Sequence, residues 1–352
     1  MVGAPGLSAM RAAMFYGPGE MQVEDIDAPT PEAGEILVDV AACGICGSDL
    51  HFYEDGFGRE IDYPITLGHE IGGTIVDTGD GVDIEVGTDV VLSPHTACDE
   101  CWSCERGLFN LCQNLHATSA KPGGYAEQVV EQAENAIPLP DGVSPADAAI
   151  AQPVGVGLHA VRQSPLGLGD SALIVGSGPI GLGAVLAAKS AGAGPIFVSE
   201  PQDSRRNVAA DFGADVLIDP TEEDPKERIQ EETEVGVDVA FEAVGAEVTL
   251  EQAVESTRPN GHTTVIGVFG EEVSFDPQLL VSRQRTIGGS TSHQLGPMIT
   301  KEYDVVLRLI AEGDLDPELY VTSRIDLEDV VEDGFEVLLD GSSEERKILV
   351  TP

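Results

Sequence analysis

The sequence predicts an α/β protein made of a β-rich part and a doubly wound parallel sheet. In the first part, short runs such as Glu35–Val40 alternate apolar and polar residues, which is typical of half-buried strands. Beyond residue 171, apolar runs of strand length alternate with helical patterns, as expected for parallel strands joined by crossover helices. The glycine-rich turn 176–181 joins the first of these strands to the first of these helices.

The composition is strongly acidic. The 352 residues allow two domains of ordinary size, and 62 Asp and Glu against 18 Lys and Arg give a net charge of −44. The acids are scattered along the chain, so we expect a solvated, self-repelling surface that needs salt for screening. This predicts a halophile's protein from a salt-rich cytoplasm, and it disfavours nucleic acid and anionic membranes as partners.

The sequence shows neither a secretory leader nor a membrane span. Met1–Ala9 lacks a basic start and an apolar core, so we interpret it as an upstream start or a cloning remnant before Met10. The most apolar stretch, Ala172–Ser199, is interrupted by glycines, prolines and Lys189. We therefore expect a soluble, cytoplasmic protein.

The stretch 42–51, ACGICGSDLH, is predicted to form a metal site with a second segment. Its glycines allow a tight turn that presents the sulfur of Cys46, and His69 and Glu70 follow an apolar run further along. Thiolate, imidazole and carboxylate are the ligands of catalytic zinc, which keeps one position open. The turn also carries two side chains that can relay a proton: Ser48 and His51.

Four further cysteines predict a second, structural zinc site. They follow the pattern CxxCxxCx7C, which places four thiols within fifteen residues. Four sulfurs at this spacing can close a tetrahedral cage. Disulfides and an iron–sulfur cluster are the alternatives, but a cytosolic chain disfavours the first and the spacing disfavours the second. The predicted ligands are Cys98, Cys101, Cys104 and Cys112.

The glycine-rich turn predicts a dinucleotide site. It follows the apolar strand Ser171–Val175 and opens a helix, and a second strand then ends at Glu200. Glycines let a pyrophosphate approach the helix N-terminus, and the carboxylate can accept hydrogen bonds from ribose hydroxyls. This favours NAD, although Arg205 and Arg206 keep NADP open. The predicted cofactor contacts are Gly176, Gly178, Pro179, Ile180, Gly181, Glu200 and Arg205.

Taken together, the motifs CGICGSDLH, GHE, the cysteine cluster, GGYAE, GSGPIG and VDVAFEAVG resemble those of the zinc-dependent medium-chain alcohol dehydrogenases. Within that family the chain is most similar to the polyol branch, especially the 2,3-butanediol dehydrogenases. The resemblance implies a GroES-like β-rich catalytic domain over 10–160 and 292–352, with a zinc lobe at 95–115. It also implies a Rossmann NAD(P)-binding domain over 161–291, an active site between the domains, and a homotetramer, with a dimer as the alternative.

The resemblance also implies a mechanism. Zinc on Cys46 and His69 would lower the pKa of the alcohol, whose carbon then gives hydride to the nicotinamide. Ser48 would take the hydroxyl proton and pass it through the nicotinamide ribose to His51. Asp49 resembles the carboxylate that fixes the tautomer of the zinc histidine, with a helix cap as the alternative. The implied cofactors are two zinc ions per subunit, one catalytic and one structural, and NAD.

Gln152 departs from the family, which has Glu or Cys at this position. A neutral amide is a poorer zinc ligand, so we expect Cys46, His69 and Glu70 to hold the catalytic metal. In that case Gln152 would bond a zinc-bound water or coordinate only in some states. Alternatively, Gln152 ligates directly and Glu70 withdraws, or the site is degenerate and binds no metal.

The predicted reaction is the reversible, NAD-linked oxidation of a small secondary alcohol or vicinal diol to the ketone. Glucose, sorbitol-type and threonine dehydrogenases are the alternatives, although the absence of an arginine near Thr291 argues against long polyols. A non-catalytic NAD-binding protein is an alternative of another class. Such a protein would be expected to lose Cys46, Ser48 or His51, and all three are present.

Overall fold

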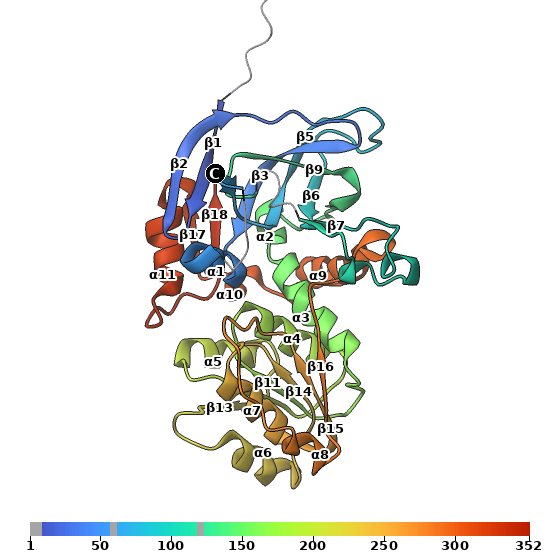
Figure 1. Cartoon of the computed structure of the whole chain (residues 1–352), viewed down its shortest axis with the longest axis vertical. Helices are drawn as coiled ribbons and strands as arrows, with labels where there is room; N and C mark the ends of the chain where they lie inside the picture. The colour runs from blue at the N-terminus through green and yellow to red at the C-terminus, as the bar shows by residue number, and fades with distance from the viewer. Residues whose placement is uncertain (1–8, 57–61, 118–122) are drawn as a thin grey trace, which may run out of the picture. The chain divides into compact units, whose positions relative to one another are not determined.

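The protein is described from a computed structural model that covers residues 9–56, 62–117 and 123–352. Residues 1–8 of the segment interpreted as an upstream start or a cloning remnant lie outside the described residues. The chain divides into two compact units. The first runs to Gln152 and resumes at Gln294–Pro352, and the second is Pro153–His293, drawn from green through yellow to orange in Figure 1.

The first unit is built mainly on antiparallel strands. A three-stranded sheet has the order β2-β1-β4, and a seven-stranded sheet has the order β10-β6-β5-β3-β18-β17, with β9 also paired to β3. The strands are β1 (Ala9–Gly17), β2 (Glu20–Asp27), β3 (Glu35–Gly44), β4 (Ile65–Thr66), β5 (Glu70–Thr78), β6 (Asp89–Leu92), β9 (Gln128–Gln132), β10 (Ala136–Pro138), β17 (Ser323–Asp326) and β18 (Ile348–Thr351).

Strand β3 lies at the centre of this unit and leads into the predicted metal turn. Its apolar side chains, such as Ile36 and Val38, are fully buried in the core. The closing strand β18 pairs antiparallel with its end, where Val350 faces Cys43. The chain's last strand therefore returns to the turn that begins near residue 44.

Short elements complete the first unit. They include the hairpin of β7 (His95–Thr96) and β8 (His116–Ala117) at the cysteine cluster. The helices are α1 (Gly47–Asp55), α2 (Pro145–Ala148), α9 (Thr300–Glu312), α10 (Pro317–Tyr320) and α11 (Glu336–Leu339).

The second unit contains a six-stranded, wholly parallel sheet in the order β13-β12-β11-β14-β15-β16. This order reverses between β11 and β14, which makes that position the topological switch point where such sheets bind ligands. The strands are β11 (Ala172–Val175), β12 (Ile196–Ser199), β13 (Val216–Ile218), β14 (Val237–Glu242), β15 (Thr257–Val265) and β16 (Thr286–Gly289). The predicted doubly wound sheet of six strands is thus confirmed.

Helices connect these strands, as the sequence pattern predicts. Helix and sheet share one hydrophobic core, since Ile229 of a helix lies in the same buried cluster as Leu173 and Phe197 of the strands. The helices are α3 (Ala151–Gln163), which begins in the first unit, α4 (Pro179–Ser190), α5 (Asp203–Asp211), α6 (Pro225–Thr233), α7 (Glu247–Ser256) and α8 (Gln278–Val281). Throughout the described ranges, every helix is too short or too polar to cross a bilayer.

Candidate metal and cofactor sites

Cys46 and His69 come together because their strands are neighbours. Strand β3 ends at Gly44 and pairs there with Glu70, the first residue of β5. Cys46 follows the end of β3, and His69 precedes the start of β5. One ligand atom from each of Cys46, His69 and Glu70 lies within 4.8 Å of the others.

A buried carboxylate stands behind the histidine. Oδ1 of Asp49 lies 3.3 Å from Nδ1 of His69, while its Oδ2 accepts from the amide of Cys46 at 3.0 Å. Asp49 is therefore both a partner of the imidazole and a cap of helix α1. Burial alone would lower the pKa of His69, but the nearby Asp49 carboxylate and Cys46 sulfur raise it well above its ordinary value.

Tyr125 completes this network. Its hydroxyl donates to Oδ2 of Asp49 at 2.7 Å, and its ring is fully buried. Burial raises the pKa of Asp49, but His69 and the hydrogen bonds outweigh it and hold that pKa below its ordinary value. The motif GGYAE contains this tyrosine, but nothing in the motif indicates a contact with Asp49, 76 residues away.

Glu70 already has a strong partner, which the sequence reasoning missed. Nζ of Lys347 lies 2.8 Å from Oε1 and 2.7 Å from Oε2, and it also donates to the carbonyl oxygen of Ile45 at 2.7 Å. The side chains of Glu70 and Lys347 are 0% and 1% exposed. A Cβ at Gly44 would lie 2.0 Å from Oε2 of Glu70, so a larger residue here would displace the carboxylate from its place beside Lys347.

The remaining residues predicted for the catalytic site are placed as follows. Ser48 and His51 lie half-buried on helix α1, which starts directly after Cys46. Gln152 is buried in the first turn of α3. Among the His, Cys, Asp and Glu residues that the structure describes, Cys46, His69 and Glu70 share one potential ion position.

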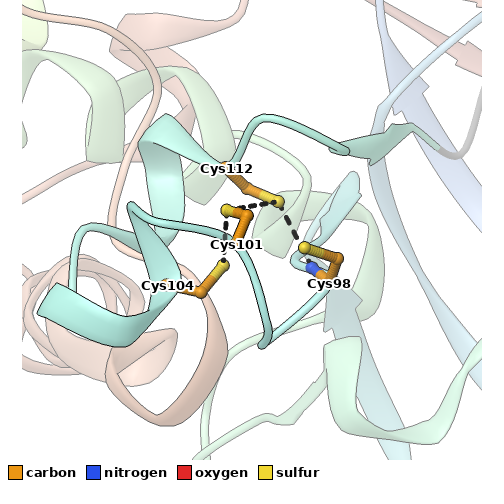
Figure 2. A group of neighbouring side chains, drawn as sticks. All are labelled: Cys98, Cys101, Cys104 and Cys112. Atoms are coloured by element: carbon orange, nitrogen blue, oxygen red, sulfur yellow. Dashed lines mark hydrogen bonds between the residues drawn. The ribbon is translucent and has the colours of Figure 1, made fainter.

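The four cysteines of the lobe converge on one point (Figure 2). The sulfur of Cys101 lies 3.5 Å from that of Cys104 and 3.9 Å from that of Cys112. The amide of Gln113 donates to the sulfur of Cys101 at 3.4 Å, and the amide of Cys98 donates to that of Cys112 at 3.3 Å. None of these cysteines is in a disulfide.

The sulfurs of this cluster differ in pKa, because backbone donors and neighbouring sulfurs act on them unequally. Backbone amides, chiefly that of Gln113, lower the pKa of Cys101 to about 6. Burial and the neighbouring sulfurs raise the pKa of Cys104 to about 12. Four sulfurs with backbone donors fit the closed tetrahedral site of structural zinc, while the mixed set at Cys46 fits zinc with an open position.

The lobe also carries the chain's single tryptophan on its surface. Trp102 is 58% exposed, and the guanidinium of Arg106 lies 4.3 Å from the centre of its ring. This arrangement is a cation–π contact in which the Arg106 side chain covers part of the Trp102 ring. Trp102 lies next to Cys101 in the sequence, so its environment depends on the shape of the lobe.

The glycine-rich turn has the tight geometry that its sequence predicts. Gly176 has φ +89°, and a Cβ at Gly181 would lie 1.9 Å from the carbonyl oxygen of Gly176. Helix α4 starts at Pro179 directly after this turn. The turn therefore brings the backbone close to the N-terminus of α4, as phosphate binding requires.

Glu200 is held at the end of β12 beside the turn. Its two carboxylate oxygens accept from the backbone amides of Ser177 and Gln202, each at 3.0 Å. The carbonyl oxygen of Arg205 accepts from the hydroxyl of Ser177. The guanidinium of Arg206 is paired with Asp203 and with Asp219.

Each of the two units contains residues that match a known protein family. Residues 32–141 match the family described as alcohol dehydrogenase GroES-like domain, and residues 179–312 match the one described as zinc-binding dehydrogenase. The L-threonine 3-dehydrogenase of Pyrococcus furiosus is 35% identical over 96% of both chains. The (R,R)-butanediol dehydrogenase of Bacillus subtilis is 35% identical over 97% of this chain and 100% of that one.

A solved structure shows the same fold. The putative zinc-binding dehydrogenase of Sinorhizobium meliloti, bound to NADP, has a TM-score of 0.89 and is 31% identical over 98% of this chain and 100% of that chain. The similarity in sequence and in fold extends over nearly the whole length of both chains. The chain is an oxidoreductase that belongs to the zinc-dependent alcohol dehydrogenase family.

Proposed function

We propose that the chain catalyses the reversible, NAD-linked oxidation of a small secondary alcohol or vicinal diol to the ketone. The proposal rests on one observation, the convergence of Cys46 and His69 with Asp49 behind the imidazole. Similarity to a butanediol dehydrogenase over 97% of this chain supports the diol.

In this proposal one set of residues binds the metal and another set transfers the proton. Cys46 and His69 hold the catalytic ion, and Asp49 keeps the imidazole in the tautomer that leaves Nε2 for the metal. When bound, zinc supplies Lewis-acid polarisation of the substrate oxygen. Ser48 accepts the hydroxyl proton, and His51 passes it toward solvent.

Glu70 and Gln152 are the two alternative candidates for the third protein ligand of the catalytic zinc in this proposal. The buried ion pair with Lys347 supports an arrangement in which Glu70 stays withdrawn and Gln152 coordinates. Glu70 becomes a ligand only when Lys347 releases it. Zinc affinity tests this: Gln152→Ala should weaken catalytic zinc binding more than Glu70→Gln does, and the reverse order would contradict it.

We propose NAD as the preferred cofactor. Glu200 is fixed where a ribose is expected, and its charge would repel a 2′-phosphate. Arg206, which could neutralise a phosphate, is paired with Asp203 and Asp219. Measuring kcat/KM with NAD and with NADP tests the proposal. In Glu200→Ala, the ratio of kcat/KM for NAD to kcat/KM for NADP should fall. A preference for NADP in the unaltered protein would contradict it.

Threonine oxidation is the second candidate, because a similar relative is an L-threonine 3-dehydrogenase. A panel of 2,3-butanediol, L-threonine, glucose, sorbitol and simple secondary alcohols, run in molar salt, separates the two. We expect 2,3-butanediol to give the highest kcat/KM. No turnover of any of them with NAD or NADP would favour a non-catalytic protein.

The quaternary and cellular context completes the proposal. We propose a cytoplasmic homotetramer from a halophile with two zinc ions per subunit, one held by Cys46 and His69 and one by the cysteine lobe. We also propose residues 10–160 and 292–352 as the catalytic domain and 161–291 as the cofactor domain. Metal analysis and sedimentation in high and low salt test the stoichiometry and the assembly.

A further inference from the structure

A buried carboxylate lies at the switch point of the parallel sheet and takes no part in the chemistry described above. Glu242 is the last residue of β14, and it pairs with Val175 at the end of β11 and with Val265 at the end of β15. Its side chain is 0% exposed. A carboxylate in such a place is costly unless it is hydrogen-bonded, so its partners indicate its role.

The carboxylate organises the loop that follows β14. Its Oε1 accepts from the amides of Val244 at 2.9 Å and Gly245 at 2.8 Å, and from the hydroxyl of Thr249 at 2.8 Å. Thr249 lies in the first turn of α7. The side chain therefore joins the end of β14 to the start of α7 and fixes the loop between them.

Glu242 also organises the loop that follows β15. Its backbone carbonyl accepts from the amides of Ile266 at 2.8 Å and Gly267 at 3.0 Å. Its Oε2 has no hydrogen-bond partner among the described residues and lies 2.6 Å from where a Cβ would stand on Gly267. One residue thus fixes two loops at the carboxyl edge of the sheet.

These loops border the place where a dinucleotide is expected. A Cβ at Gly176 would lie 2.5 Å from Val244, so the first loop packs against the glycine-rich turn. A Cβ at Gly245 would lie 2.2 Å from the carbonyl oxygen of Val268, so the loops touch each other. Val244 and Val268 are nevertheless 48% and 47% exposed. The two loops that Glu242 fixes therefore each carry an exposed apolar side chain.

We propose that Glu242 is a positioning residue for the nicotinamide half of the dinucleotide. A doubly wound sheet binds one mononucleotide on each of its halves. The turn after β11 and Glu200, which directly follows β12, belong to the adenosine half, so the half formed by β14, β15 and β16 receives the nicotinamide. Glu242 sets Val244 and Val268 at the edge of that half. This inference rests on the proposed use of a nicotinamide dinucleotide.

Calorimetric titration with two ligands tests the inference. NADH carries both halves, whereas ADP-ribose lacks the nicotinamide. Glu242→Ala leaves two amides and a hydroxyl without their acceptor, so the Kd for NADH should rise about tenfold or more. The Kd for ADP-ribose should rise clearly less than the Kd for NADH, because only one of the two loops packs against the glycine-rich turn of the adenosine half.

Companion variants separate positioning from folding. Glu242→Gln keeps an oxygen for the same donors and should restore the NADH Kd to within about threefold of the original. Glu251→Gln removes a charge from an exposed face of α7 and should change neither Kd. If Glu242→Ala does not fold, Glu242→Asp decides, since its shorter reach should weaken NADH binding more than ADP-ribose binding.

The outcomes are distinct. Unchanged NADH binding in Glu242→Ala, or equal weakening of both ligands, would overturn the inference while leaving the proposed function standing. If the unaltered protein bound neither NADH nor ADP-ribose, the proposed cofactor use itself would fail.

Discussion

Nζ of Lys347 lies within hydrogen-bonding distance of both carboxylate oxygens of Glu70, at 2.8 and 2.7 Å, in the interior of the first unit. Lys347 directly precedes β18, and Glu70 begins β5, 277 residues earlier in the chain. The same ammonium bonds Ile45, next to Cys46. The end of the chain thus holds the turn that carries the predicted catalytic cysteine.

Removing Lys347 should destabilise the fold strongly. Lys347→Met leaves the Glu70 carboxylate buried without a counter-charge, so the free energy of unfolding should fall by about 3–5 kcal/mol. Urea unfolding followed by far-UV circular dichroism in molar salt measures this change.

Two variants serve as controls for that measurement. The double variant Glu70→Gln, Lys347→Met carries no charge at the site and should recover most of the loss. Lys226→Met breaks a surface pair with Glu255 and should cost less than about 1 kcal/mol. If Lys347→Met lowered the free energy of unfolding by less than about 1 kcal/mol, the buried pair would not be important for stability.

Asp49 should control zinc affinity at the catalytic site. Asp49→Asn removes the negative charge facing His69, and it should weaken zinc binding there about 10- to 100-fold. Tyr125→Phe removes only the 2.7 Å hydrogen bond to Asp49 and should have a smaller effect in the same direction. Competition with a chromogenic chelator measures both. Unchanged zinc affinity in Asp49→Asn would show that this carboxylate serves only as a helix cap.

Loss of one lobe cysteine should remove one zinc ion per chain. Cys112→Ser leaves three sulfurs, which cannot close the tetrahedral site, so metal analysis should fall from about two ions to about one. Cys43→Ala changes a buried cysteine outside both clusters and should leave the metal content unchanged. An unaltered count in Cys112→Ser would exclude this cysteine as a ligand.

Asp238 should make the second unit's stability depend on pH. Burial alone would raise the pKa of Asp238, but hydrogen bonds from Arg258 and Ser171 outweigh it and hold the pKa below its ordinary value. A lowered folded pKa stabilises the protein above the unfolded pKa of about 3.9, and this stabilisation is lost as the pH falls through the lower folded value.

The matching measurement compares Asp238→Asn with the unaltered chain by urea unfolding in molar salt. The variant should cost about 1–2 kcal/mol at pH 7 and pH 5, because it weakens charge-assisted hydrogen bonds to Arg258 and Ser171. The difference should shrink only below about pH 4. A cost that disappears between pH 7 and pH 5 would contradict the lowered pKa.

Local patterns in the sequence predicted much of the fold. The six parallel strands follow from apolar runs between helical segments, and the tight turn at Gly176 follows from its glycines. The convergence of the four lobe cysteines follows from their spacing within fifteen residues. In each case residues close in sequence determine the structure.

The contacts that the sequence did not predict join distant segments. Tyr125 reaches Asp49 across 76 residues, and Lys347 reaches Glu70 across 277. Neither tyrosine nor lysine carries a periodic or spacing signal that names its partner. Glu242 was seen only as part of a strand motif, because its role depends on two loops that meet in the folded sheet. Such partners are set by strand pairing, which one sequence does not specify residue by residue.

Trp102 has a practical consequence for anyone following this protein in solution. Since it is the chain's one tryptophan and lies on the cysteine lobe beside Arg106, intrinsic emission excited at long ultraviolet wavelengths reports on that lobe. A melting curve recorded this way would follow loss of the thiolate-bound ion and could precede unfolding of either sheet. The tryptophan would therefore serve as a built-in sensor for the zinc ion proposed at the cysteine lobe, while the sheets require a different optical signal.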